Sequence, residues 1–242
     1  MLKIFDLNEI TEEKIEFICE SWLPFPRHKV SFVVGPGGLG KSLIVIQLLL
    51  RHNLKYPEEK LFAWLSEDVK GTTKQRANLI CKNILKIDPN IIKNLYISDS
   101  PSIHLNQKSI MDFKKTLAEF QVIIIDPLIA FYDGDENSNV DARGFMQNFT
   151  KWAKEDSKTI IFIHHSAKYS SKSRGASAFV DAVRLVYEIE QIENNNFYRK
   201  VKIAKDNYGV ASKVKNHEFV IEVVPTQVKQ KIKFVPVEGE AK

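Results

Sequence analysis

The feature that most constrains this chain is a glycine-rich loop between a strand pattern and a helix pattern. Residues 35–42 read Gly-Pro-Gly-Gly-Leu-Gly-Lys-Ser and match G-x-x-x-x-G-K-[ST] at every fixed position. The β-branched residues 30–34 before the loop predict a buried strand, and residues 42–53 after it predict a helix. Glycines let successive backbone N–H groups turn inward, where they can cradle phosphate oxygens at the positive end of a helix. The loop therefore predicts a nucleoside triphosphate site.

Two side chains of the loop have separate roles in this chemistry. Lys41 can reach the outer phosphates as a mobile positive charge, and the Ser42 hydroxyl can bind magnesium. Magnesium also needs a carboxylate, and Asp126 ends the most apolar strand pattern, where ligands gather in open α/β sheets. The alternative for Asp126 is a cap on the turn before Pro127. We expect ATP and Mg²⁺ as cofactors, with Ser42 and Asp126 at the metal. Nucleotide contacts are expected from Gly35, Pro36, Gly37, Gly38, Leu39, Gly40, Lys41, Ser42 and Leu43.

Strand and helix patterns alternate through the first two thirds of the chain. This alternation predicts right-handed βαβ units and a mainly parallel sheet covered on both faces. Thr72 or Thr73 is a candidate N-cap of one helix, and Ser109 with Asp112 is a candidate capping pair of another. The later period-two patterns predict antiparallel strands at one edge. Strands are predicted at residues 60–65, 95–98, 122–126, 159–163, 185–189, 198–204, 219–224 and 232–237, and helices at 72–86, 109–120 and 140–155.

Length and composition fit one cytoplasmic domain without membrane spans. The 242 residues are 44% hydrophobic and 27% charged, ordinary values for a globular protein. No apolar run approaches the ~18 residues of a membrane helix. Cys19 and Cys81 match no metal-site spacing and are expected to be free thiols. We expect a lead-in at 1–29, where residues 5–20 have apolar positions at helical spacing, a core at 30–210 and edge strands at 211–242.

Hydrolysis also needs a group that orients and polarises the attacking water. No acid directly follows the metal-site aspartate, so the candidate lies elsewhere. Glu67, at the end of a predicted strand, is the better candidate, and Asp68 is the weaker one. His164 and His165 end another predicted strand, where neighbouring side chains point to opposite sides. We favour His165 as the contact to the γ-phosphate. The alternatives are that Glu67 and Asp68 form a surface acidic pair and that both histidines have structural roles.

With these residues in place, the chain resembles the RecA-like ATPases, in the branch of the plasmid RepA-type replicative helicases, with DnaB- and KaiC-type relatives. The resemblance implies a RecA-like P-loop core with C-terminal antiparallel strands. It also implies a homo-oligomeric ring, usually a hexamer, with ATP at subunit interfaces, Glu67 activating water and Asp126 at the metal. Its carriers, within residues 20–210, are Trp22-Leu23-Pro24, the loop, Ser66-Glu67-Asp68, Ile124-Ile125-Asp126-Pro127-Leu128, Glu136-Asn137, His164-His165-Ser166-Ala167-Lys168 and Arg174-Gly175-Ala176-Ser177-Ala178.

The resemblance further implies a cation that stabilises the transition state from a neighbouring subunit. Lys205 fits the position of this cation. Asn207 stands where DnaB-type helicases carry an arginine, so Lys202 and Arg199 stay open as alternatives. Arg76 resembles an arginine that lies near the nucleotide base in such ATPases.

The basic charge is concentrated in the last third of the chain. The formal net charge is +5, and residues 168–215 alone carry ten Lys or Arg against five Asp or Glu. In ring helicases the loop after the histidine strand lines the central channel. We therefore expect Lys168, Lys172 and Arg174 to contact the backbone of single-stranded DNA. The alternative is a solvated surface loop without nucleic acid.

Two functions fit these features. The first is a RepA-like ring ATPase that couples hydrolysis to translocation on, or unwinding of, DNA in replication. The second is a KaiC- or RadA-like regulatory or loading ATPase that switches its oligomeric state without helicase activity. A small-molecule phosphotransferase shares the loop but fits the histidine segment and the basic segment poorly.

Overall fold

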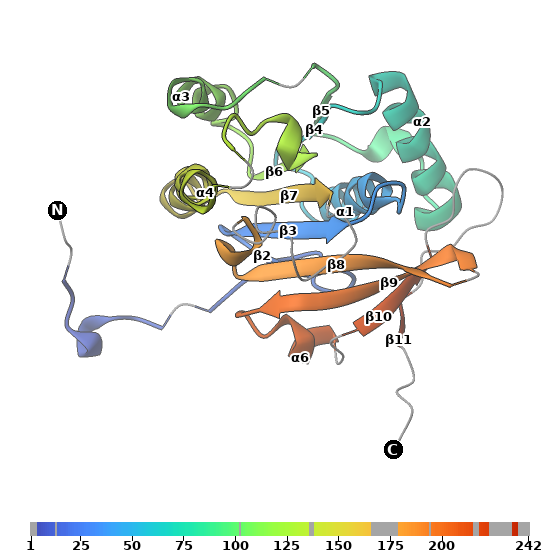
Figure 1. Ribbon diagram of the computed structural model, residues 1–242. Coiled ribbons are helices and arrows are strands. Elements are labelled where there is room, and N and C mark those ends of the chain that lie inside the picture. The colour runs from blue at the N-terminus through green and yellow to red at the C-terminus, as the bar shows by residue number, and fades with distance from the viewer. Residues whose placement is uncertain are drawn as a thin grey trace.

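The computed structural model describes residues 4–12, 14–101, 103–135, 138–165, 179–193, 195–214, 218–222 and 234–236. Within these ranges, nine strands form one sheet (Figure 1). They are β3 (Val30–Gly35), β4 (Leu61–Leu65), β5 (Leu95–Ser98), β6 (Val122–Asp126), β7 (Thr159–His165), β8 (Leu185–Ile192), β9 (Asn195–Asp206), β10 (Glu218–Glu222) and β11 (Phe234–Pro236). A separate antiparallel pair joins β1 (Phe17–Ile18) and β2 (Phe25–Pro26).

The sheet has a parallel part and an antiparallel part. Its order is β11-β10-β9-β8-β3-β7-β6-β4-β5. The strands from β5 to β8 run parallel, whereas β9, β10 and β11 extend the β8 edge in antiparallel pairs. This arrangement confirms the predicted α/β fold with C-terminal antiparallel strands. It also brings the carboxyl ends of β3, β4, β6 and β7 together at one end of the sheet, where the candidate site lies.

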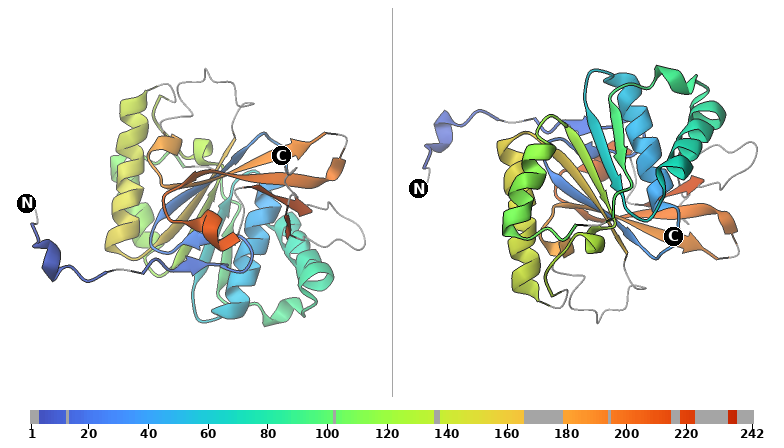
Figure 2. Two further views of the ribbon diagram at one scale, coloured as in Figure 1. Left: turned by 90° about the horizontal axis from the view of Figure 1, so that it is seen from below. Right: turned by 90° about the horizontal axis from the view of Figure 1, so that it is seen from above.

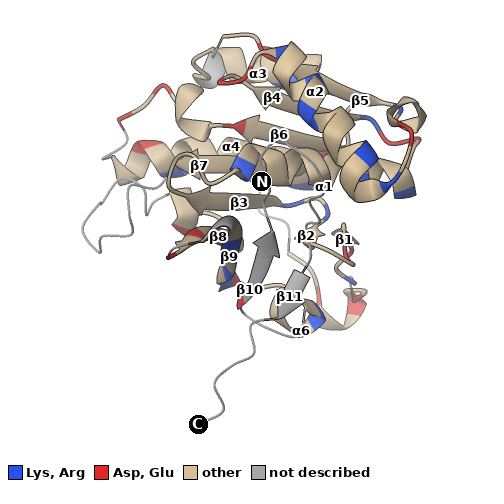
Figure 3. Ribbon diagram, turned by 90° about the vertical axis from the view of Figure 1, so that its right-hand side faces the viewer, with Lys and Arg blue, Asp and Glu red and all other residues tan. Residues whose placement is uncertain are grey.

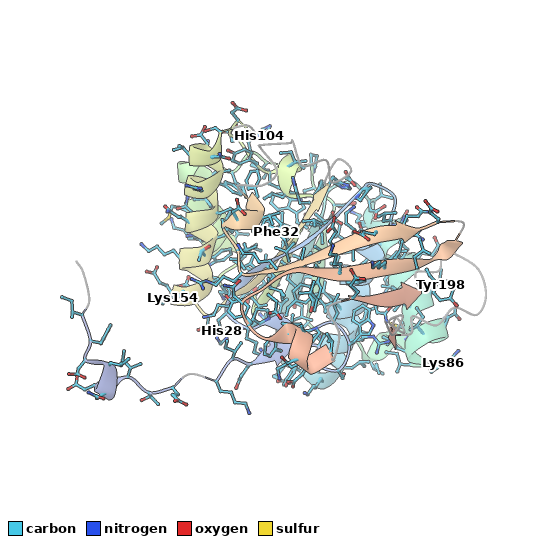
Figure 4. The ribbon with its side chains drawn as sticks, turned by 60° about the horizontal axis from the view of Figure 1, so that its bottom comes forward. His28, Phe32, Lys86, His104, Lys154 and Tyr198 are labelled. Atoms are coloured by element: carbon cyan, nitrogen blue, oxygen red, sulfur yellow. The ribbon has the colours of Figure 1, made fainter. Side chains whose placement is uncertain are left out.

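Helices cover both faces of the sheet because alternate strand residues face opposite sides. Val33 and Ile124 face α1 (Lys41–Lys55) and α2 (Lys70–Ile80), whereas Phe32 and Ile123 face α3 (Gln107–Thr116) and α4 (Asn139–Glu155). In Figure 2 the blue α1 and the yellow-green α4 stand on either side of the strands. Phe32, in the middle of Figure 4, is fully buried, which contributes roughly 1.5–3 kcal/mol. A short α6 (Val210–Val214) follows β9.

The start predicted for the second helix was wrong, whereas its helical turns continue to Leu85, next to the predicted end at Lys86. α2 begins at Lys70, before Thr72 and Thr73, and the N-cap Val69 makes no side-chain cap bond. The Lys70 backbone N–H instead donates to Asp99 Oδ2 at 2.9 Å, so a residue after β5 caps the helix. The α-helix ends at Ile80 and continues as a π-helical turn (Cys81–Leu85). Tertiary structure set this start, because the cap is distant in sequence.

The predicted capping pair of α3 was also wrong, by three residues. Ser109 N–H donates to Asn106 Oδ1 at 3.0 Å, and Asn106 N–H donates to Ser109 Oγ at 2.9 Å. Asn106 therefore caps the helix and Ser109 closes the reciprocal bond. Asp112 lies inside the helix, where it pairs with Lys115 at 3.6 Å.

The N-terminal residues do not form the helix that their spacing favours. Only a 3₁₀ turn (Leu7–Glu9) forms there, and none of its residues is buried. The segment before β1 leaves the body as an extended arm, which lies at the left of both views in Figure 2. An amphipathic pattern needs a surface to pack on, and this arm has none within its own subunit. In the described part of the chain, no helix has the length and apolarity to cross a bilayer.

Candidate nucleotide site

The loop after β3 has the backbone geometry that its glycines permit. Gly38 and Gly40 adopt left-handed φ values of 76° and 82°, which other residues rarely take. Gly35 is constrained by space instead, because a Cβ there would lie 2.5 Å from the carbonyl oxygen of Ile189. The loop thereby turns its residues toward the start of α1, which begins at Lys41. This shape leaves backbone N–H groups and the helix N-terminus available for phosphate.

Lys41 is held inside the loop. Its side chain is almost fully buried, and Nζ donates to the carbonyl oxygens of Gly35 at 2.8 Å and Pro36 at 2.6 Å. Burial lowers the pKa of Lys41, while the charges of Asp126 and Glu67 oppose that shift. The lysine therefore sits where a triphosphate would exchange carbonyl partners for phosphate oxygens.

Ser42 and Asp126 meet at the proposed metal position. Ser42 Oγ donates to Asp126 Oδ2 at 2.6 Å, and Asp126 is 3% exposed. Burial raises the pKa of Asp126, and the bond from Ser42 opposes that shift. Asp126 Oδ1 is buried without a hydrogen-bond partner among the described residues. A hydroxyl and a carboxylate with one open oxygen fit Mg²⁺, which takes few protein ligands and keeps several waters.

Glu67 lies at the end of β4, beside β6. The Ser66 N–H donates to the Asp126 carbonyl oxygen at 3.1 Å, which fixes the two strand ends relative to each other. The Glu67 side chain is 61% exposed, so it can reach solvent water. The Ser66 Oγ also donates to the Asp126 carbonyl oxygen, at 3.3 Å. Sequence reasoning gave Ser66 no positioning role, because the partner lies 60 residues away in sequence.

The two histidines at the end of β7 point in opposite directions. His165 Nδ1 lies 3.4 Å from Lys41 Nζ, and its Nε2 lies 3.6 Å from Glu67 Oε2. His164 is 4% exposed and packs near the rings of Phe32 and Phe179. Burial lowers the pKa of His164 to about 4, with smaller contributions from His165 and Lys41. His165 therefore belongs to the polar site, and His164 is a neutral core residue.

The phosphate loop, the site residues and the strand order agree with a comparison of the sequence with known protein families. The sequence profile of the AAA domain family matches residues 6–171, more than half of the chain. The chain belongs to this family. A search of curated proteins gave no match. Membership supports a P-loop ATPase domain that binds nucleotide, and the matched part of the AAA domain contains Lys41, Glu67, Asp126 and His165.

Two other candidate residues of the chain have partners of their own. The Arg76 guanidinium forms an ion pair with Asp68, which lies in the loop before α2. Lys205 stands opposite Val186, near the start of β8. Its Nζ donates to the carbonyl oxygens of Val180 at 3.4 Å and Asp181 at 2.9 Å. The Lys205 backbone is therefore level with Phe32, three residues before Gly35, and β9 is two strands away from β3.

The residues expected to bind DNA are outside the described part of the chain. They are Lys168, Lys172 and Arg174. Of the alternative trans cations, Lys202 pairs with Glu188 in the β8–β9 ladder, and the Arg199 side chain donates to the Tyr198 carbonyl oxygen at 2.8 Å.

Proposed function

We propose that this AAA domain is a ring motor of the RepA type, which couples ATP hydrolysis to movement along single-stranded DNA. The observation that carries the proposal is the position of His165 between Lys41 and Glu67, at 3.4 Å and 3.6 Å. His165 is also the last residue of β7, directly before the basic segment that contains Lys168 and Lys172. A change at the phosphate site thus has a direct covalent route to that segment.

Nucleotide binding would replace contacts that the loop makes with itself. Lys41 would exchange the carbonyl oxygens of Gly35 and Pro36 for β- and γ-phosphate oxygens. Ser42 and Asp126 would hold magnesium, which supplies charge neutralisation on the phosphates when bound. The burial of Lys41 and Asp126 keeps water from screening these charges.

Hydrolysis needs two further groups. Glu67 would orient the attacking water and accept its proton, because it stands at the rim of the site with an exposed carboxylate. A neighbour's Lys205 would stabilise the developing charge in trans, since the chain's own Lys205 is two strands from β3 and donates to the carbonyl oxygens of Val180 and Asp181. This arrangement makes the ring, rather than the single subunit, the active form.

The proposal is tested by measuring ATP hydrolysis with and without single-stranded DNA, together with displacement of a labelled strand. Glu67→Gln should retain ATP binding and lose hydrolysis by about 100-fold or more. Asp68→Asn is the matched control, because it alters the adjacent acid, which pairs with Arg76. It should stay within a few fold of the parent protein.

The result also separates the two candidate functions. Stimulation by DNA with strand displacement supports the motor. Hydrolysis without either effect rejects the helicase function and favours an oligomeric switch that loads another protein. A loss of hydrolysis in Asp68→Asn rather than Glu67→Gln would reassign the water-activating residue.

A further inference from the structure

A second pocket of the chain lies beneath α2, outside the candidate nucleotide site. It is enclosed by α1, α2, β4 and β5, and its volume is about 190 Å³. The described residues that line it do not include the phosphate loop, Glu67, Asp126 or His165. Its wall is mainly apolar and includes Ile46, Leu49, Ala63, Ala77, Ile92 and Ile97.

The size of this pocket limits a ligand to about one ring. Apolar protein cavities of roughly 150 Å³ accept benzene, whereas sites for drug-sized ligands occupy about 300 Å³ or more. A pocket of about 190 Å³ can therefore hold a single aromatic ring with a small substituent. It has no room for a nucleotide.

One polar side chain of the wall lacks a hydrogen-bond partner. Thr73 lines the pocket from α2 and is 3% exposed. Its Oγ1 is buried and makes no hydrogen bond to any described residue. A buried hydroxyl without a partner costs free energy, and a ligand group that bonds to it would remove that cost. The ligand should therefore carry one hydrogen-bonding group.

The other groups around the pocket favour a neutral ligand. Cys81 is 1% exposed, and burial raises the pKa of its thiol, so this part of the wall is uncharged. Lys74 lines the pocket and is exposed, and Figure 3 shows further basic positions along α2. Positive charge at this side disfavours an ammonium ligand, and the apolar wall disfavours an unpaired carboxylate in the interior.

We propose that this pocket binds a neutral single-ring molecule with one hydroxyl group, held between α1 and α2. The apolar wall contacts the ring, and the hydroxyl of the ligand bonds to Thr73 Oγ1. Phenol is the simplest member of this class and serves as the probe. The proposal does not rest on the ring motor, because it concerns binding to one chain in the absence of nucleotide.

The first test compares phenol with toluene, which has nearly the same shape but carries a methyl group in place of the hydroxyl. Backbone amide NMR of the isotope-labelled full chain gives both dissociation constants and shows whether the Thr73 and Ala77 signals move. Thr73→Val should weaken phenol binding by about fivefold, because valine removes the hydroxyl and keeps the branched shape. Toluene affinity should change by less than about twofold.

The matched control for this variant is Thr72→Val. Thr72 is the neighbouring threonine of α2 and does not line the pocket. Its substitution should leave the affinities of both probes unchanged.

The second test fills the pocket with a larger side chain. Ala77→Leu should weaken the binding of both probes by about tenfold or more, because the added atoms occupy the space of the ring. Ala211→Leu is the matched control, because Ala211 is also partly buried against the same core but lies on α6. If Ala77→Leu does not fold by circular dichroism, Cys81→Met fills the pocket from another side with a flexible side chain.

The outcomes decide the proposal without reference to ATP hydrolysis. Selective loss of phenol binding in Thr73→Val, with loss of both probes in the filled pocket, supports it. Three results would overturn it: no measurable binding of either probe to the parent chain, binding that the filling variants leave unchanged, or equal weakening of phenol and toluene in Thr73→Val. The motor is tested by the hydrolysis and strand-displacement assays alone, so either proposal can fail while the other stands.

Discussion

The two ends of the parallel strands differ in how their charged groups are satisfied. At the carboxyl ends, Lys41 and Asp126 are buried and bonded to the loop and to Ser42. At the amino ends, Lys154 and Arg184 line an open cavity of about 810 Å³ and form no ion pair with any described acid. The first end thus already has the ordered contacts that the proposed nucleotide site requires. At this second end Arg27, which also lines the cavity, pairs with Glu59 at 2.9 Å. Substitutions of Lys154 or Arg184 should therefore affect hydrolysis much less than substitution of Lys41.

The largest effect is expected from removing the cation of the carboxyl end. Lys41→Ala should lower ATP hydrolysis by about 1000-fold, because in the proposed mechanism the lysine would stabilise the charge that develops on the phosphates. Lys154→Ala, at the amino end, is the matched control and should leave hydrolysis within about twofold. Steady-state phosphate release measures both. Equal losses in the two variants would contradict the distinction between the ends.

The next largest effect is expected for Lys205, which is proposed to act on the nucleotide of a neighbouring subunit. Lys205→Ala should lower hydrolysis by about 100-fold in assembled protein, because its charge would act on the neighbour's phosphates. Mixing Lys205→Ala with Lys41→Ala should restore activity, since some interfaces then pair an intact loop with an intact trans lysine. No recovery on mixing, or a larger loss in Lys202→Ala or Arg199→Ala, would move the trans role elsewhere.

A third prediction concerns the histidine behind the site. The pKa of His164 falls from 6.5 to about 4 in the folded protein, so the unfolded chain takes up its proton first as pH falls. Stability from this group is complete above pH 6.5 and decreases toward pH 4. When the pH falls from about 7.5 to about 4.5, the free energy of unfolding should decrease by roughly 2–3 kcal/mol more in the parent protein than in His164→Phe. Urea unfolding at both pH values checks this, and parallel curves would show that His164 does not titrate as described.

The smallest effect is expected where the carboxyl end meets the proposed DNA segment. His165→Gln should lower the ratio of hydrolysis rates with and without single-stranded DNA by about tenfold, because it removes the contact to Lys41 and Glu67. His104→Gln, an exposed histidine with a 66% exposed side chain, is the control. An unchanged ratio in His165→Gln would show that the link between the site and the segment runs through other residues.

Local sequence patterns predicted which helices and strands form better than they predicted where each one begins and ends. Residues 95–98 and 122–126 have the predicted limits, because their apolar runs are bounded by polar turn residues. The start of α2 was missed because its cap, Asp99, comes from a loop beyond β5. The helical spacing at residues 5–20 gave no helix for two reasons. Residues 4–12 have no surface of their own subunit to pack on, and Phe17 and Ile18 are buried as strand β1 instead.

By itself, the sequence determined the phosphate loop, the buried strands and the alternation that yields a parallel sheet, because these depend on neighbouring residues and on backbone freedom at Gly38 and Gly40. Only the tertiary structure decided which distant side chains meet. Ser42 and Asp126 are 84 residues apart in sequence, and Lys41 and His165 are 124 apart. Their contacts follow from the strand order β6-β7-β3, which is selected by burial of both sheet faces rather than by any local preference.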